Sequence, residues 1–584
     1  MRSIRLLLVL SAVSAVSAAC SEGPTLTRRD TGVGSDTGSA DDTGTGEDTS
    51  AAEDVIDDLV AMEDAAMMGM DATVQPDSSA ADTGVTADTG VARDVMTGPV
   101  DLVVRINGAP MDAPDRFTGA EVPAITAPEI VYPESGTVVP PNLSGLEYHL
   151  RGPAGVQLYE LVFRGTNGRV RVYSPCVSVG GGCVVAINAE AMAGIAGAAS
   201  GAELQVSVRA QTSAGIGRAT TAQLGVSQSD IRGGVYYWTV EGVTNAIMRY
   251  EWGAGTARSE QFVQGNVVAC VGCHSLSRDG TRVAVGVGIP GPSWMSTYDA
   301  TSRMTVGSAY RANFATFSPD NSRLLTSNGS VLAQIDPATG AAISGYPSGI
   351  SGTQPDWAPN GSKIVLTVAS GMIPIGSPGH GAPASLQIMP YDTAARRYGG
   401  TTTLLPSTGE NNYYPHFAPD SDWIIFNRAS GQSSSAPDAR LWAIRASAGG
   451  APVEFVAANR TGNLVNSWPR WAPFNDTYNG QQIFWFTFSS HRDYGLRVRN
   501  SSAMNPTAQL WMAAFKISEG VARRDPSTPA FWLPFQSTTG SNHIAQWTER
   551  VQRRTCGMDT ECAPGERCVS LITAGGARRC VGGM

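Results

Sequence analysis

The fold of this chain is decided by the stretch Phe317-Ser318-Pro319-Asp320-Asn321-Ser322-Arg323-Leu324-Leu325, because degenerate copies of it recur along the sequence. The other copies begin at His274, Trp357, Phe417 and Trp471. A small residue of each copy lies at position 277, 318, 358, 418 or 472, so successive copies are 41, 40, 60 and 54 residues apart. A period of this length is typical of a β-propeller, in which each repeat forms one four-stranded blade.

The residue types within the repeat explain its local structure. An aromatic residue ends one strand, Pro restricts φ in the turn that follows, and Asp, Asn or Gly suits the remaining turn positions. The pattern resembles the repeats of TolB-like β-propellers over about residues 232–547, and Ser489–Gly495 is similar to a strand-end turn of that family. The resemblance implies six blades, with seven as the alternative. It also implies that residues 542–547 pair with the first blade and close the propeller.

The segment 100–226 has a different pattern, with short alternating runs and no long helical period. Apolar and polar residues alternate in Leu102–Ile106, Val156–Phe163, Val170–Tyr173 and Leu204–Ala210. This alternation is typical of half-buried strands. The strand number resembles an immunoglobulin- or fibronectin-like β-sandwich. The predicted fold is therefore all-β: a sandwich, a propeller and a small disulfide-rich module over 553–584.

Residues 1–20 predict export. Two arginines precede the apolar run Leu6–Val16, which is too short to span a bilayer as a helix. Small residues then precede Cys20, and the arrangement resembles a bacterial lipoprotein signal in which this cysteine carries lipid. Ser17 stands where that family has Leu or a similar residue, so ordinary cleavage to a secreted protein is the alternative. Ser21 implies an outer-membrane lipoprotein, by resemblance to sorting in Gram-negative bacteria.

Residues 21–98 form an acidic segment with 18 acidic and 3 basic residues and no Trp, Tyr or Phe. Such a composition cannot bury enough apolar surface to offset the entropy of ordering, so a disordered tether is expected. The whole chain has a net charge of −10, and this segment contributes −15, so the acidic balance belongs to the tether. No basic cluster with interleaved aromatic residues predicts a nucleic-acid partner.

The strongest cofactor signal is the run Cys270-Val271-Gly272-Cys273-His274, which has the C-x-x-C-H spacing of c-type haem attachment. The two thiols would form thioethers to one porphyrin, and His274 would be the proximal iron ligand. The expected cofactor is haem c, with His543 as the distal ligand because propeller closure brings it toward the signature. Other candidate distal ligands are Met295, His416 and His491. The competing interpretation is a Cys270–Cys273 disulfide with a structural His274.

The remaining cysteines are consistent with an exported protein. Cys176 and Cys183 flank a short Gly-rich run and are placed to staple a hairpin. Four more form a C-terminal cluster that favours two disulfides in an oxidising compartment, with a zinc site as the competitor. These four are Cys556, Cys562, Cys568 and Cys580.

Two functions follow from these patterns. The first is an outer-membrane lipoprotein, anchored in lipid through Cys20, whose haem serves extracytoplasmic electron transfer or redox sensing with a redox partner. The second is a haem-free TolB-like scaffold at the cell envelope that binds a protein or a glycan. Hydrolase and nucleotide-binding motifs are absent from the sequence, which favours a binding or electron-transfer protein over an enzyme.

Overall fold

The computed structural model describes residues 99–584 apart from short gaps, and these residues belong to one compact unit. The gaps are 243, 255–257, 266–269, 289–293, 346–349, 378, 434–435, 448, 563, 572–576 and 583–584. The predicted signal peptide, the lipidated Cys20 and the acidic tether lie outside the described residues. Among the described helices, none has the length and apolar character needed to cross a membrane.

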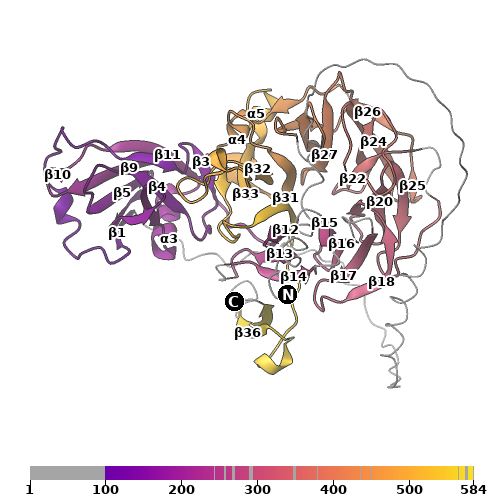
Figure 1. Ribbon diagram of the computed structural model, residues 1–584, viewed down its shortest axis with the longest axis horizontal. Helices are drawn as coiled ribbons and strands as arrows, with labels where there is room; N and C mark the ends of the chain where they lie inside the picture. The colour runs from indigo at the N-terminus through magenta and orange to yellow at the C-terminus, as the bar shows by residue number, and fades with distance from the viewer. Residues whose placement is uncertain are drawn as a thin grey trace, which may run out of the picture. The chain divides into compact units, whose positions relative to one another are not determined.

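The N-terminal part of this unit consists of two β-sheets (Figure 1). One sheet has the strand order β1-β6-β5-β9-β11-β3, with β10 paired to β9, and the other has the order β2-β4-β8-β7. The strands are β1 (Val100–Arg105), β2 (Glu129–Tyr132), β3 (Thr137–Val139), β4 (Glu147–Arg151), β5 (Leu158–Gly165), β6 (Gly168–Ser174), β7 (Val177–Val179), β8 (Gly182–Ala186), β9 (Glu203–Thr212), β10 (Gly215–Ile216) and β11 (Thr220–Val226). The short helix η1 covers Asp115–Phe117. The predicted alternation holds best in β9, where every second residue is buried.

Helix α3 (Ala189–Ala199) is a feature that the sequence patterns did not predict. Asn188 caps it, because its side chain accepts a hydrogen bond of 2.9 Å from the Ala191 amide. The helix buries Met192 and Ile195 against β1, β5 and β6. Its other residues are mostly Ala and Gly, which are apolar on every face and therefore hide the helical period.

The C-terminal part is a β-propeller with six blades in the described residues. From the innermost strand outward, the first blade is β35 (Ser541–Thr548), β12 (Gly234–Glu241), β13 (Thr244–Glu251) and β14 (Glu260–Gln264), and the second is β15 (Cys270–Leu276), β16 (Arg282–Gly288), β17 (Trp294–Asp299) and β18 (Thr305–Arg311). The third blade is β19 (Phe314–Phe317), β20 (Leu324–Asn328) and β21 (Val331–Ile335), and the fourth is β22 (Thr353–Trp357), β23 (Lys363–Ala369) and β24 (Ala384–Asp392), with β25 (Arg397–Tyr398) and β26 (Thr402–Leu405). The fifth blade is β27 (Asn411–Phe417), β28 (Trp423–Ala429), β29 (Arg440–Arg445) and β30 (Val453–Glu454), and the sixth is β31 (Ser467–Tyr478), β32 (Gln481–Ser490), β33 (Gln509–Lys516) and β34 (Phe531–Trp532). Connecting helices are α4 (Val456–Asn459), η2 (Asn500–Ser502) and α5 (Ile517–Val521). In the part of the chain that the structure describes, the third blade has three strands where the repeat length predicted four.

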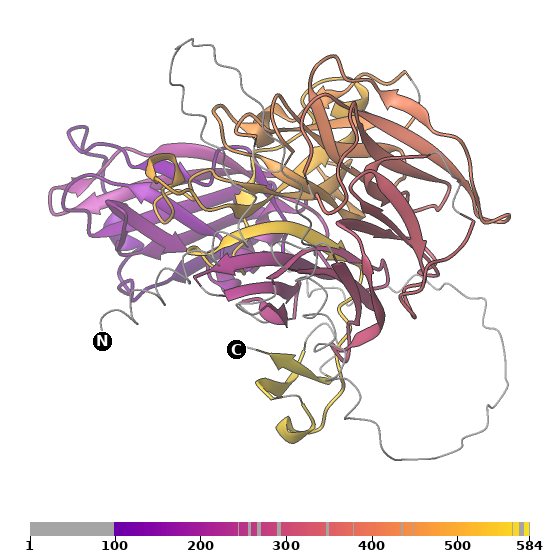
Figure 2. The same ribbon diagram turned by 45° about the vertical axis from the view of Figure 1, so that its right-hand side comes forward.

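The six innermost strands form a closed ring. Each of β15, β19, β22, β27 and β31 contacts the next, and β35 contacts both β31 and β15. Strand β35 also pairs antiparallel with β12, as the predicted closure requires (Figure 2). The last strand of the propeller therefore completes the first blade.

The repeat motif forms the same turn in successive blades. In four of them the amide of the small residue donates to the carbonyl five residues ahead, at 2.8–2.9 Å: Ser277 to Arg282, Ser318 to Arg323, Ala358 to Lys363 and Ala418 to Trp423. The residue three positions after the small residue is left-handed in each blade, at Gly280, Asn321, Gly361 and Ser421. This conformation explains why Gly and Asn recur there, because both adopt positive φ at low cost.

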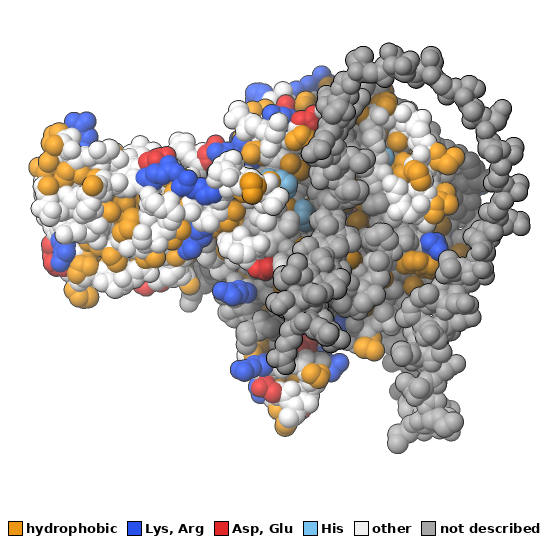
Figure 3. Space-filling view, in the orientation of Figure 1, with side chains coloured by type: hydrophobic (Ala, Val, Ile, Leu, Met, Phe, Trp, Pro, Cys, Tyr) orange, Lys and Arg blue, Asp and Glu red, His pale blue; other side chains and the backbone are white. Residues whose placement is uncertain are grey.

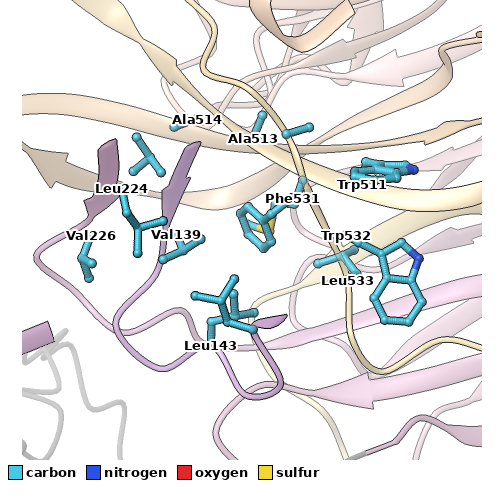
Figure 4. Close-up of a cluster of buried hydrophobic side chains, with 14 of the residues drawn as sticks. Val139, Leu143, Leu224, Val226, Trp511, Ala513, Ala514, Phe531, Trp532 and Leu533 are labelled. Atoms are coloured by element: carbon cyan, nitrogen blue, oxygen red, sulfur yellow. The ribbon is translucent and has the colours of Figure 1, made fainter. Parts of the chain in front are cut away.

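An apolar interface joins the two parts of the unit (Figure 4). Strand β3 contacts β33 and β34, and Val139, Leu143, Leu224 and Val226 of the sandwich belong to the same buried cluster as Phe531 of the propeller. A continuous apolar core indicates that the two parts do not move as independent domains.

The described disulfides agree with the predicted Cys176–Cys183 pair and with two disulfides in the C-terminal cluster, whose connectivity the sequence left open. They join Cys176 to Cys183, Cys556 to Cys568 and Cys562 to Cys580. The last two staple the C-terminal hairpin of β36 (Glu566–Ser570) and β37 (Arg578–Gly582) to the segment around η3 (Asp559–Glu561). These four sulfurs are in disulfides, so they do not form the competing zinc site.

Candidate functional site: the axial channel and the junction groove

One polar residue from each innermost strand lines the propeller axis. In the repeat, this residue lies two positions before the small residue of the turn. The set, called here the polar ring, is Ser275, Thr316, Asp356, His416, Arg470 and, from β35, Gln546. Each lines one or both of two small cavities along the axis, with volumes of about 30 Å³ and about 100 Å³. The axial channel is therefore narrow and polar.

The acid and the imidazole of the polar ring are largely desolvated. Asp356 Oδ2 accepts a hydrogen bond of 2.7 Å from the Phe417 amide, but burial dominates and raises the pKa of the carboxyl to about 7. Nδ1 of His416 accepts from the Trp471 amide at 3.2 Å, so its Nε2 carries the proton. That Nε2 lies 3.8 Å from Asp356 Oδ1, too far for a direct hydrogen bond. Burial and the charges of nearby arginines hold the pKa of His416 well below its ordinary value.

Strand β31 brings two buried N–H groups without hydrogen-bond partners to the same small cavity. Arg470 donates through Nη1 to the Pro469 carbonyl at 2.8 Å, whereas its Nε has no partner among the described residues. The indole N–H of Trp468 is also buried and unpartnered there. Both side chains line the 30 Å³ cavity. Buried donors without acceptors are rare in folded proteins and call for an explanation.

The backbone at the channel is irregular in a repeated way. Register shifts interrupt β15, β22, β27, β31 and the β12–β35 pair next to the polar ring. Positive φ values of 51–57° occur two residues before the polar ring at Gln354, Tyr414, Trp468 and Ile544. Bulky residues rarely adopt this conformation, and such strain gathers at functional sites. The Tyr414 and Trp468 rings stack at 3.7 Å, and both residues line the 30 Å³ cavity.

The predicted haem-binding residues lie beside this channel on β15. Cys273 and His274 line the 30 Å³ cavity, and Cys270 is buried nearby on the same strand. Both ring nitrogens of His274 face backbone carbonyls: Nε2 lies 3.1 Å from Tyr236 O and Nδ1 lies 3.4 Å from Gly272 O. Burial lowers the pKa of His274 to about 4, so the ring is neutral. No disulfide joins Cys270 to Cys273, both of which the structure describes.

The predicted distal ligand does not face the same cavity. His543 pairs with Trp238 across the β12–β35 ladder, and its Nε2 lies 2.9 Å from Ser541 Oγ. Burial lowers its pKa to about 3. Two of the alternative ligands, Met295 and His416, do line the cavity beside His274. Closure thus brings β35 to the signature, but it is Gln546 that touches it, donating 2.6 Å to His274 O.

This arrangement does not fit a haem. The cavity beside His274 has room for about one or two water molecules. The imidazole nitrogen that would face iron is directed at a carbonyl of the neighbouring strand. Haem attachment at Cys270 and Cys273 stays a prediction that would require β15 to separate from the first blade.

A larger groove lies where the sandwich meets the propeller, and we call it the junction groove. Its volume is about 520 Å³. It is lined from the sandwich by Gly145 and Glu147 and from the propeller by Tyr237, Thr239, Glu241, Met248, Arg258, Ser259, Gln261, Tyr494, Arg497, Trp532, Pro534, Phe535, Gln536, Ser537 and Thr538. Ligand pockets in proteins commonly occupy about 300–1,000 Å³ and lie between domains.

A charged network fixes the sandwich side of the junction groove. Glu147 accepts hydrogen bonds from Arg497 at 2.6 and 2.7 Å and from Tyr494 at 2.9 Å. Nε2 of His149 is also 3.0 Å from the carboxylate. These partners outweigh burial and lower the pKa of Glu147 to about 2. Tyr494 lies in the predicted strand-end turn Ser489–Gly495, but nothing in the sequence indicated that it would meet Glu147. Glu147 and Arg497 were not singled out, because they lie 350 positions apart in the chain and belong to no motif.

The propeller side of the groove is built from stacked rings and two exposed arginines, Arg258 and Arg497. Tyr494 stacks on Trp532 at 4.1 Å, and Phe535 stacks on Tyr250 at 4.2 Å. Arg258 is exposed at the edge. The groove is therefore lined by a mixture of aromatic and polar side chains, with charged residues at its rim.

Comparison with known proteins shows only remote similarities. No protein-family model and no curated protein matches the chain. Among solved structures, TolB from Acinetobacter baumannii is 12% identical over 60% of this chain and 80% of its own, with a TM-score of 0.36. Hydrazine synthase from Kuenenia stuttgartiensis is 11% identical over 48% of this chain and 76% of its own, with a TM-score of 0.31. At these scores the similarities carry no functional argument, and the propeller is defined here by its own sheets.

Proposed function

We propose that this protein is an exported, TolB-like propeller protein of the cell envelope that binds a protein partner in the junction groove. In this proposal the N-terminal signal directs export, and lipid on Cys20 anchors the acidic tether in the outer membrane. An immunoglobulin-like sandwich stands beside the propeller and forms one wall of the groove. The observation that carries the proposal is the groove itself, with its volume of about 520 Å³ between two joined domains.

The walls of the groove are organised before any partner arrives. The Glu147–Arg497 pair and the shared apolar core hold the two domains together, so binding need not order them. Arg258 and Glu241 supply charge at the rim, where side chains of a partner would find polar contacts. A polar and charged rim of this kind is typical of protein interfaces.

A protein partner fits these walls better than a glycan. Sugar binding by stacking needs aromatic faces that are open to solvent. The lining rings Tyr237, Tyr494, Trp532 and Phe535 are each at most 7% exposed. Their faces are therefore already covered by protein.

Site-specific photo-crosslinking tests the proposal in the full-length protein expressed in its envelope. A photo-reactive phenylalanine at Arg258 should form one discrete protein adduct, and the same group at Met372, which is 89% exposed on another blade, should not. The adduct should weaken when Glu241→Arg reverses a rim charge. Equal labelling from both positions, or adducts that carry only saccharide, would overturn binding of a protein in the groove.

Lipid anchoring is tested separately. Cys20→Ser should abolish incorporation of labelled palmitate and release the protein from the membrane fraction. Labelling that persists in this variant would contradict the proposed anchor.

The haem-bearing alternative has a direct test. A pyridine haemochrome spectrum of denatured protein, made in a periplasm that matures a control cytochrome, reports covalent haem. Because the cavity beside His274 is small, we expect no c-type band. A band that disappears in the Cys270→Ala/Cys273→Ala variant would instead establish the electron-transfer or redox-sensing function.

A further inference from the structure

We propose that the axial channel binds a single small anion, such as chloride, through the N–H groups of Trp468, Arg470 and His416. This site is separate from the junction groove and does not depend on the proposed partner. Its ligand would be monoatomic, because the cavity that these three side chains line has a volume of about 30 Å³.

The donors around this cavity need an acceptor. Trp468 is only 6% exposed, and its indole N–H is buried without a hydrogen-bond partner. Two residues along the strand, Nε of Arg470 is also buried without a hydrogen-bond partner. The tautomer of His416 places a third N–H at Nε2, which is 3.8 Å from Asp356 Oδ1, on a side chain that is 23% exposed. Three donors that line one cavity define a site for an acceptor atom rather than for a metal ion.

The charges that line the channel favour an anion over a neutral water molecule. Arg470 carries the positive charge, and Arg278 lies at the opposite end of the channel, where it pairs with Glu549 at 2.8 Å. The imidazoles of His416 and His274 are neutral because burial lowers their pKa. Asp356 is the remaining acid of the polar ring, and Cys273 is the thiol that lines the cavity. When Asp356 is protonated, Arg470 has no counter-charge, and an anion would supply it.

Anion binding should therefore be linked to protonation of Asp356. The ionised carboxylate would repel the anion and neutralise Arg470 itself. Burial raises the pKa of this carboxyl to about 7, so the binding-competent form is lost above neutrality. Because apparent affinity scales with the competent fraction, it should fall about tenfold for each pH unit above that pKa.

Thermal unfolding of the full chain tests the linkage. The unfolding temperature should rise with chloride at pH 6, compared with gluconate at equal ionic strength, and rise much less at pH 8. Asp356→Asn should keep the chloride effect at both pH values, and Arg470→Gln should lose it. Asp320→Asn is the matched control, because Asp320 lies in a repeat turn and pairs with Ser318 and Ser322 outside the cavity. Equal effects of chloride and gluconate at pH 6 would overturn the proposal.

Anomalous diffraction from native crystals grown at pH 6 in bromide gives a test that no variant's folding can obscure. We expect one bromide peak between Trp468, Arg470 and His416. An ordered channel that contains only water under these conditions would overturn the site.

Discussion

The axial channel and the junction groove differ in where their residues come from and in how fully their polar groups are hydrogen-bonded. The channel takes one residue from each repeat, buries acid and base without direct pairing, and leaves N–H groups unsatisfied. The groove takes residues from two domains, and its acid, Glu147, has three hydrogen-bonding side chains as partners. As a result, the pKa of Asp356 is raised and the pKa of Glu147 is lowered. The stability contributed by the two sites therefore responds to pH in opposite directions. Symmetry alone does not make a recognition site, because the symmetric channel is too narrow for a partner.

The Tyr414–Trp468 stack gives the largest expected effect. Trp468→Ala removes a buried ring that lines the channel and should cost about 3–5 kcal/mol of unfolding free energy, measured by denaturant titration. Trp294→Ala is the control, because Trp294 is 40% exposed at an outer blade position and should cost much less. A similar loss for both variants would mean that the channel end contributes no special packing.

Asp356→Asn tests whether the buried carboxyl of the channel destabilises the fold when it is ionised. The folded protein binds this proton more tightly than the unfolded chain, so the native acid destabilises the fold as pH rises from about 4 through about 7. The shift corresponds to roughly 4 kcal/mol at most, and the asparagine variant should therefore be the more stable protein at pH 8. Urea titrations at pH 4 and pH 8 measure the difference. A variant that is less stable at pH 8 would show that the carboxylate is paired.

Glu147→Gln should have the opposite pH dependence. The pKa of Glu147 is lowered from 4.5 to about 2, so its stabilisation is complete above pH 4.5 and is lost as pH falls toward 2. The variant should lose roughly 3 kcal/mol at pH 7 and little at pH 2. Glu129→Gln removes an exposed partner of Arg151 and serves as the control. If the two variants behave alike, the groove is not held by this network.

Arg258→Ala should give the smallest stability change, within about 0.5 kcal/mol, because the side chain is exposed. Its effect should appear in recognition, as a weaker adduct from a photo-reactive residue placed at Thr538. An adduct of unchanged yield would remove Arg258 from the proposed interface.

Part of the fold and of the candidate site follows from the sequence alone. The repeat spacing correctly predicted the propeller, the closing strand and the lower of the two blade counts. It also placed the C-x-x-C-H run at the first blade, whereas the structure has this run on β15, the innermost strand of the second blade. It did not predict the left-handed backbone at Tyr414, Trp468 and Ile544, because bulky residues disfavour positive φ and only ring closure enforces it. His543 was chosen from strand proximity, whereas the register turns it toward Trp238.

By itself, the sequence determined what depends on local pattern: strand alternation, the repeat turn with its left-handed Gly or Asn, and the Cys176–Cys183 pair. Only the tertiary structure decided which residues share a site. The Glu147–Arg497 pair joins residues 350 positions apart, and the polar ring exists only because six strands meet at one axis. Local pattern is read from neighbours in the chain, whereas desolvation and hydrogen-bond saturation depend on neighbours in space. For that reason, the pKa values of Asp356 and Glu147 differ in sign of shift although both are carboxylic acids on β-strands.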